Sequence, residues 1–239
     1  MLRTLLGEMP RQNSGLLEEA IETMYKSIHI VRREVKRNQD PSHNYRKLEI
    51  WLLGLVNSLD ELEQSCYAAA FFREKVKAGF MEDMTDQEQL EYTRYVYFYK
   101  NGFIRVFSTL DKLGTVLNDM YDLNTSKVKT HYSYFTVLRQ FRANKVHPHL
   151  AQSLTDIKET YKDEMTALRK RRNTEIHYMN SEMQDDLWQR HRGLHTKLEL
   201  EDLDLHMMQL EKGLEMVCRS LTTSFKYTNR EWAKKGMRG

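Results

Sequence analysis

The sequence contains few of the residues that interrupt helices or cross-link small domains. Among its 239 residues are three prolines, ten glycines and two cysteines. So few prolines and glycines favour helix along the whole chain. Two cysteines do not make a disulfide framework, and they fit a reducing compartment. We therefore expect a helical protein held by its own hydrophobic core, since at this length folding buries about 70% or more of the unfolded surface.

Long apolar runs are also missing. The longest, residues 51–56, is six residues long, whereas a membrane-spanning helix needs about 20. The apolar run at the N-terminus is too short for a signal peptide, because Glu8 and Arg11 follow it closely. These absences predict a cytoplasmic protein that does not enter the membrane. The formal net charge of +3 permits an acidic partner without requiring one.

Apolar residues recur at intervals of three and four along most of the chain, which is the period of an amphipathic helix. The first stripe spans residues 17–35 and the second spans 48–66, with a Pro-containing turn at 38–42 between them. This pattern predicts an N-terminal αα-hairpin. Together with a loose leader, it occupies residues 1–83 in the predicted domain organisation.

Residues 84–239 predict four further helices. A capping box at Thr85 and Glu88 begins a long helix with an aromatic-rich stripe from 92 to 117. Those rings could stack on bases, but their helical spacing favours an ordinary core. A short helix is expected near 134–141, a fifth from 154 into residues 169–178, and a last one directly after a second capping box at Thr196 and Glu199.

The basic residues 226–239 are interpreted as a frayed terminus, or as a segment that follows a phosphate backbone.

Helices with such apolar stripes must bury the stripes against each other. The predicted fold is therefore all-α, an antiparallel bundle of about six long helices. The pattern alone does not decide whether an apolar stripe packs against a helix of the same chain or against a helix of a second chain.

Residues 169–178 combine a basic run, an amide and an imidazole. Arg172 is followed by the polar Asn173 and, after three further residues, by His177. Helical residues are about 100° apart, so Asn173 and His177 share a face, whereas Arg172 and His177 point about 140° apart. An arginine and a histidine with this spacing converge on one anionic group if two copies meet, or if the helix ends at the histidine.

The same spacing occurs at Arg142 and His147. There the arginine is followed by Ala143, which is not polar, and the histidine is followed by Pro148. The residue before a proline avoids the helical region. This second pair is therefore a poorer candidate for a functional site than Arg172 and His177.

The Arg172–Asn173–x–x–x–His177 pattern resembles the Arg-polar-x-x-x-His motif of the HEPN superfamily, the all-helical domains of many prokaryotic toxin and defence ribonucleases. The segment with Ser108 and Asp111 is similar to the polar-patch helix that precedes the motif helix in that family. The resemblance implies an HEPN-like core within residues 84–239, to which the N-terminal hairpin is an addition.

The resemblance also implies an activity, which is metal-independent cleavage of RNA by the neighbouring 2′-hydroxyl in a homodimer. His177 would transfer protons, because imidazole titrates near neutral pH. Arg172 would hold the scissile phosphate by two parallel N–H bonds, and Asn173 would orient the ring or bind a phosphate oxygen. No cofactor and no metal are expected. The residues expected to contact the substrate are Arg169, Lys170, Arg171, Tyr178, Ser108 and Asp111.

An alternative interpretation is a non-catalytic helical module that binds RNA or a protein partner, such as a cognate antitoxin or another protein of a defence system. An arginine-rich helix end is commonly a solvated face that complements the helix dipole. Two pairs have the spacing of metal ligands, His191 with His195 and Asp202 with His206, but neither has an evident third ligand. Ordinary surface polarity explains them better.

Overall fold

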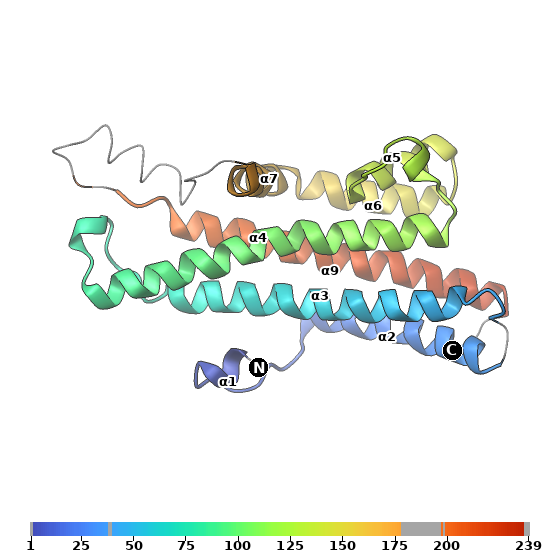
Figure 1. Ribbon diagram of the computed structural model, residues 1–239, viewed down its shortest axis with the longest axis horizontal. Coiled ribbons are helices and arrows are strands. Elements are labelled where there is room, and N and C mark those ends of the chain that lie inside the picture. The colour runs from blue at the N-terminus through green and yellow to red at the C-terminus, as the bar shows by residue number, and fades with distance from the viewer. Residues whose placement is uncertain (1, 38–39, 178–196, 198, 237–239) are drawn as a thin grey trace. The chain divides into compact units, whose positions relative to one another are not determined.

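The computed structural model describes residues 2–37, 40–177, 197 and 199–236. In these ranges the regular elements are helices (Figure 1), apart from an isolated antiparallel bridge between Phe80 and Glu199. The predicted all-α class is therefore confirmed. The α-helices are α1 (Leu2–Leu5), α2 (Gly15–Lys36), α3 (Asn44–Arg73), α4 (Asp86–Met120), α5 (Tyr134–Asn144), α6 (Pro148–Thr160), α7 (Lys162–His177) and α9 (Leu203–Lys234), with the 3₁₀ turns η1 (Met81–Asp83) and η2 (Thr125–Lys127).

The residues divide into two compact units. Unit 1 contains Met1–Pro10, Leu62–Arg105 and Lys162–Leu214, and unit 2 contains Arg11–Glu61, Val106–Tyr161 and Glu215–Gly239. The long helices α3, α4 and α9 contribute residues to both units. Helix α7 belongs to unit 1, whereas α2, α5 and α6 belong to unit 2. Within the described ranges, no helix is long and apolar enough to cross a membrane.

In unit 2, α2 lies beside the first half of α3, as the two apolar stripes predict (Figure 1). Ile28 and Val31 on α2 and Leu52 on α3 are fully buried. The Arg32 guanidinium also donates a 2.7 Å hydrogen bond to Glu49 across the pair. The predicted hairpin therefore forms because both helices hide an apolar face from water.

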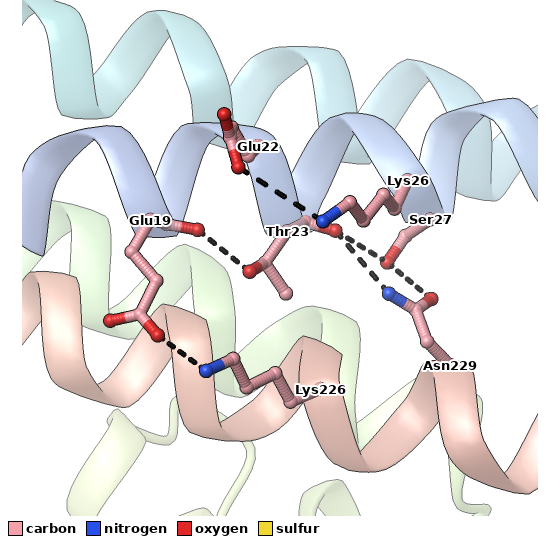
Figure 2. Close-up of polar contacts among 7 residues, drawn as sticks. All are labelled: Glu19, Glu22, Thr23, Lys26, Ser27, Lys226 and Asn229. Carbon is pink, nitrogen blue, oxygen red and sulfur yellow. Dashed lines mark hydrogen bonds and ion pairs between the residues drawn. The ribbon is translucent and has the colours of Figure 1, made fainter. Parts of the chain in front are cut away.

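Unit 2 also contains the basic segment that begins at Lys226, and the prediction of a frayed terminus is wrong for residues 226–234. Its residues up to Lys234 are part of α9, and Thr228 among them is only 1% exposed. Figure 2 shows how it is attached to α2: Lys226 pairs with Glu19, and the Ser27 hydroxyl donates a 2.8 Å hydrogen bond to Asn229. The charge count of a segment does not reveal that one of its faces is packed.

Helix α4 carries the aromatic stripe, and its rings are core residues as their spacing favours. Tyr99 and Phe103 are buried, and Tyr95, which lies off the stripe, is buried as well. Tyr97, by contrast, is 62% exposed. The helix therefore buries a wider face in unit 1 than the simple heptad pattern suggests.

The start of α4 follows the predicted capping box. The Glu88 amide donates a 3.2 Å hydrogen bond to the Thr85 hydroxyl. The Glu88 carboxylate in turn accepts the backbone amides of Ala78 and Lys77, and also that of Thr85, and these bonds lower the pKa of Glu88. One side chain thus caps α4 and fixes the segment before it.

The last helix begins later than predicted. Glu199 lies in the bridge to Phe80, and the Leu200 amide donates a 2.9 Å hydrogen bond to the Gly79 carbonyl, so this segment is extended. Helix α9 starts at Leu203, where the Asp202 carboxylate accepts the Leu205 amide at 2.8 Å. The competing cap at Asp202 and the pairing with residues 79–80 displace the expected start.

The predicted fifth helix is two helices. Helix α6 ends at Thr160, the φ of −106° and ψ of 22° at the C-cap residue Tyr161 leave the helical region, and α7 begins at Lys162. Tyr161 is buried, with 5% of its surface exposed. A break of this kind leaves the apolar spacing nearly intact, so the pattern reads as one continuous helix.

Two helical glycines give a matched test of packing in unit 2. A Cβ on Gly114 would lie 2.9 Å from the Tyr134 Cα atom, whereas a Cβ on Gly54 would meet nothing within 4 Å. Alanine is a better helix former than glycine by about 1 kcal/mol. The backbone of Tyr134, however, cannot move aside as easily as the flexible end of a side chain could. We expect Gly114→Ala to lower the free energy of unfolding by about 1–3 kcal/mol and Gly54→Ala to raise it by about 0.5–1 kcal/mol. Urea unfolding measures both, and equal shifts would contradict the close approach of α4 and α5.

Candidate functional site

The Arg172–His177 motif lies on α7, in unit 1. Asp163 and Glu164 lie in the first turn of the helix, where their negative charges complement the helix dipole, and the helix ends at His177. Of its residues, Met165 and Leu168 are buried, and both precede the motif. The motif half of α7 is therefore held by something other than apolar packing.

We call the side of α7 that carries the buried Leu168 its inner face. Beyond Leu168, the residues on this face are polar. Arg171 and Glu175 follow it at intervals of three and four, which keeps all three on one side of the helix. The Arg171 guanidinium donates a hydrogen bond to Gln209 on α9, and its central carbon lies 5.9 Å from the centre of the Tyr99 ring. A cation at this distance from an aromatic ring is attracted to it.

Glu175 makes the second polar attachment of α7. Its carboxylate lies 3.0 Å from the Lys100 ammonium on α4, and the two side chains are 28% and 16% exposed, respectively. Because water covers so little of either group, salt screens this ion pair less than an exposed one. The last two turns of α7 are thus attached to α4 and to α9 by separate contacts.

A buried polar group lies where α4 and α9 meet Arg171. The His206 ring stacks on Tyr99 with 5.3 Å between ring centres, and its Nε2 atom lies 2.8 Å from Glu201. His206 is only 2% exposed. The hydrogen bond with His206, together with the positive charge of Arg171 and Lys170, holds the pKa of Glu201 below its usual value. The basic run of α7 therefore has an acidic neighbour within unit 1.

The outer face of α7 carries the other motif side chains. Asn173 and His177 are exposed, as are Arg169 and Lys170. Arg172 is half-buried on the flank of the helix, which agrees with its angular separation of about 140° from His177. A single chain therefore presents the amide and the imidazole on one surface and the arginine beside it. Tyr178, also predicted to contact the substrate, lies outside the described residues.

Two predicted substrate contacts lie in unit 2. Ser108 is half-buried on α4. Asp111, also half-buried, accepts the Tyr134 backbone amide at 2.8 Å and so caps the start of α5. Capping at a helix N-terminus is sufficient reason for an aspartate at position 111.

The second arginine–histidine pair has a different environment. Arg142 is exposed on α5, whereas His147 lies beyond the end of that helix with a φ of 46°. The His147 Nδ1 atom is 2.9 Å from the Tyr227 hydroxyl, and burial lowers the pKa of His147. This histidine joins the α5–α6 connection to α9 within unit 2.

No group of three or more histidine, cysteine or carboxylate side chains is placed to hold a metal ion in the described part of the chain. Asp202 and His206, one of the two pairs with metal-ligand spacing, have other partners: Asp202 caps α9 and His206 pairs with Glu201. The other pair, His191 and His195, lies outside the described residues.

Sequence reasoning missed Lys100, Gln209 and Glu201 as neighbours of the motif. It also grouped Arg171 with the solvated basic run. One signal was present, because positions 168, 171 and 175 extend the inner stripe of α7 at helical spacing. Charged residues at such positions are normally read as surface, so the stripe appeared to end at Leu168.

Comparison with known protein families yields a match. The model of the Cthe2314-like HEPN family matches residues 51–229, a region that includes α4 to α7 and most of α9. This region is well over half of the chain, and it begins within α3, before the boundary predicted at residue 84. The searches of curated proteins and of solved structures gave no match. The extent of the family match shows that this chain belongs to the Cthe2314-like HEPN family.

Proposed function

We propose that this protein is a metal-independent endoribonuclease that cleaves RNA through the neighbouring 2′-hydroxyl, with Arg172 and His177 as its catalytic residues. The observation that supports this most is that a member of an HEPN family presents His177 and Asn173 together on the exposed face of its motif helix. The RNA supplies the nucleophile, and the motif supplies the side chains for proton transfer and charge stabilisation.

In the proposed reaction the 2′-oxygen attacks the adjacent phosphorus and the 5′-oxygen of the next nucleotide leaves. One proton is removed from the 2′-hydroxyl and one is delivered to the 5′-oxygen, and His177 takes part in this transfer. Arg172 stabilises the negative charge that develops on the phosphoryl oxygens. Asn173, which shares the face of His177, orients the ring or binds a phosphate oxygen. The exposed Arg169 and Lys170 attract the RNA backbone.

The proposed site is completed by a second copy of the chain. Within one chain, Arg172 and His177 point in directions about 140° apart, and Arg172 is half-buried while His177 is exposed. A two-fold axis beside α7 would bring Arg172 of one copy towards His177 of the other, because such an interface uses the same surface twice. The proposed active form is therefore a homodimer.

The same geometry favours a second candidate function, a non-catalytic module that binds RNA or a cognate protein partner of a toxin–antitoxin or defence system. The specific observation is that Arg172 and His177 do not share a face of α7 in the single chain. A basic, exposed helix end can bind an anionic partner without any chemistry.

Cleavage assays separate the two candidates. In the presence of EDTA we expect the wild-type protein to cleave RNA, and His177→Ala and Arg172→Ala to lower the rate by ~10²–10⁴-fold, because proton transfer and charge stabilisation are lost. The matched controls are His29→Ala and Arg142→Ala, which remove exposed side chains outside α7. Gel analysis of a labelled RNA measures the rates. Equal absence of cleavage in all five proteins would instead support the binding module.

Mixed dimers test whether the site is shared between two chains. Each single variant retains the residue that the other lacks, so a mixed dimer of Arg172→Ala and His177→Ala contains one intact pair if the pair comes from both chains. After joint refolding we expect about a quarter of the wild-type activity, since half of the dimers are mixed and each has one of two sites. Activity no higher than that of either variant alone would contradict a shared site.

A further inference from the structure

The contacts on the inner face of α7 change along the helix, from apolar side chains to polar ones. A helix usually takes its rotation about its own axis from an apolar stripe, but the stripe of α7 ends at Leu168. His177 lies more than two turns beyond that residue. Some other contact must therefore set the rotation of the helix at the histidine.

Arg171 and Glu175 are in the right positions to do so. They lie one turn apart on the face opposite Asn173 and His177, because two residues along a helix correspond to about 200° of rotation. Arg171 bonds to Gln209 on α9, and Glu175 pairs with Lys100 on α4. One contact alone would let the helix end pivot, whereas two contacts to different helices fix its rotation.

We propose that the Glu175–Lys100 ion pair and the Arg171–Gln209 hydrogen bond position the catalytic His177 by fixing the rotation of the motif half of α7. This assigns Arg171 a positioning role on the inner face instead of contact with the substrate. Lys100, Glu175 and Gln209 become positioning residues as well. The inference rests on the proposed ribonuclease function for its effect on the reaction, but its effect on α7 can be measured without RNA.

Charge reversal tests the proposal. Lys100→Glu places two carboxylates together and Glu175→Lys places two ammonium groups together, so each should release the end of α7. We expect either variant to speed amide hydrogen exchange in residues 172–177 and to lower kcat by ~10²-fold with a smaller change in KM, because a misplaced catalytic group costs about that much. The double variant Lys100→Glu/Glu175→Lys restores opposite charges and should recover slow exchange and most of kcat.

A second ion pair provides the matched control. Lys47 and Asp119 lie 2.8 Å apart and join α3 to α4 in unit 2. Lys47→Glu should leave both kcat and exchange in residues 172–177 unchanged. The proposal is overturned if Lys100→Glu and Glu175→Lys also leave both unchanged, or if the double variant exchanges as fast as the single ones. If the wild-type protein does not cleave RNA, the proposed function fails, and the exchange data still decide whether the ion pair holds the helix.

Discussion

The candidate site depends on the shielded ion pair between Glu175 on α7 and Lys100 on α4. Beyond Leu168 the motif helix buries no apolar side chain, so the usual driving force for helix docking is absent there. The pair, 3.0 Å long and mostly covered, supplies an attachment in its place. Opposite it, Asn173 and His177 face solvent. A polar inner face thus leaves the outer face free for chemistry.

The acidic and basic groups around α7 have complementary roles. Glu201, which precedes α9, lies near the basic run, and its hydrogen bond with His206 lowers its pKa. Its negative charge offsets part of the positive charge of Arg171 and Lys170. The side chains of Arg169 and Lys170 are exposed, where they can attract an anionic ligand. The helix can therefore be docked and still present a basic surface.

The spacing of apolar residues predicted most of the helices, because a helix that buries one face needs apolar residues at intervals of three and four. It did not separate α6 from α7 at Tyr161, since a single-residue break hardly changes the spacing. It placed the start of α9 too early, because the pairing of residues 79–80 with 199–200 is non-local. The motif could be recognised in the sequence from Arg172, Asn173 and His177. The contacts of Arg171 and Glu175 could not be predicted, because the sequence does not indicate which partner a charged side chain will contact.

In the proposed reaction, RNA is cut by its own 2′-hydroxyl with the help of His177. Mass spectrometry of the product ends tests this most directly, since attack by the 2′-oxygen leaves a 2′,3′-cyclic phosphate on one fragment and a 5′-hydroxyl on the other. We expect these ends with the wild-type protein and their absence with His177→Ala. Fragments that carry 3′-hydroxyl and 5′-phosphate ends would contradict it, because water would then be the nucleophile.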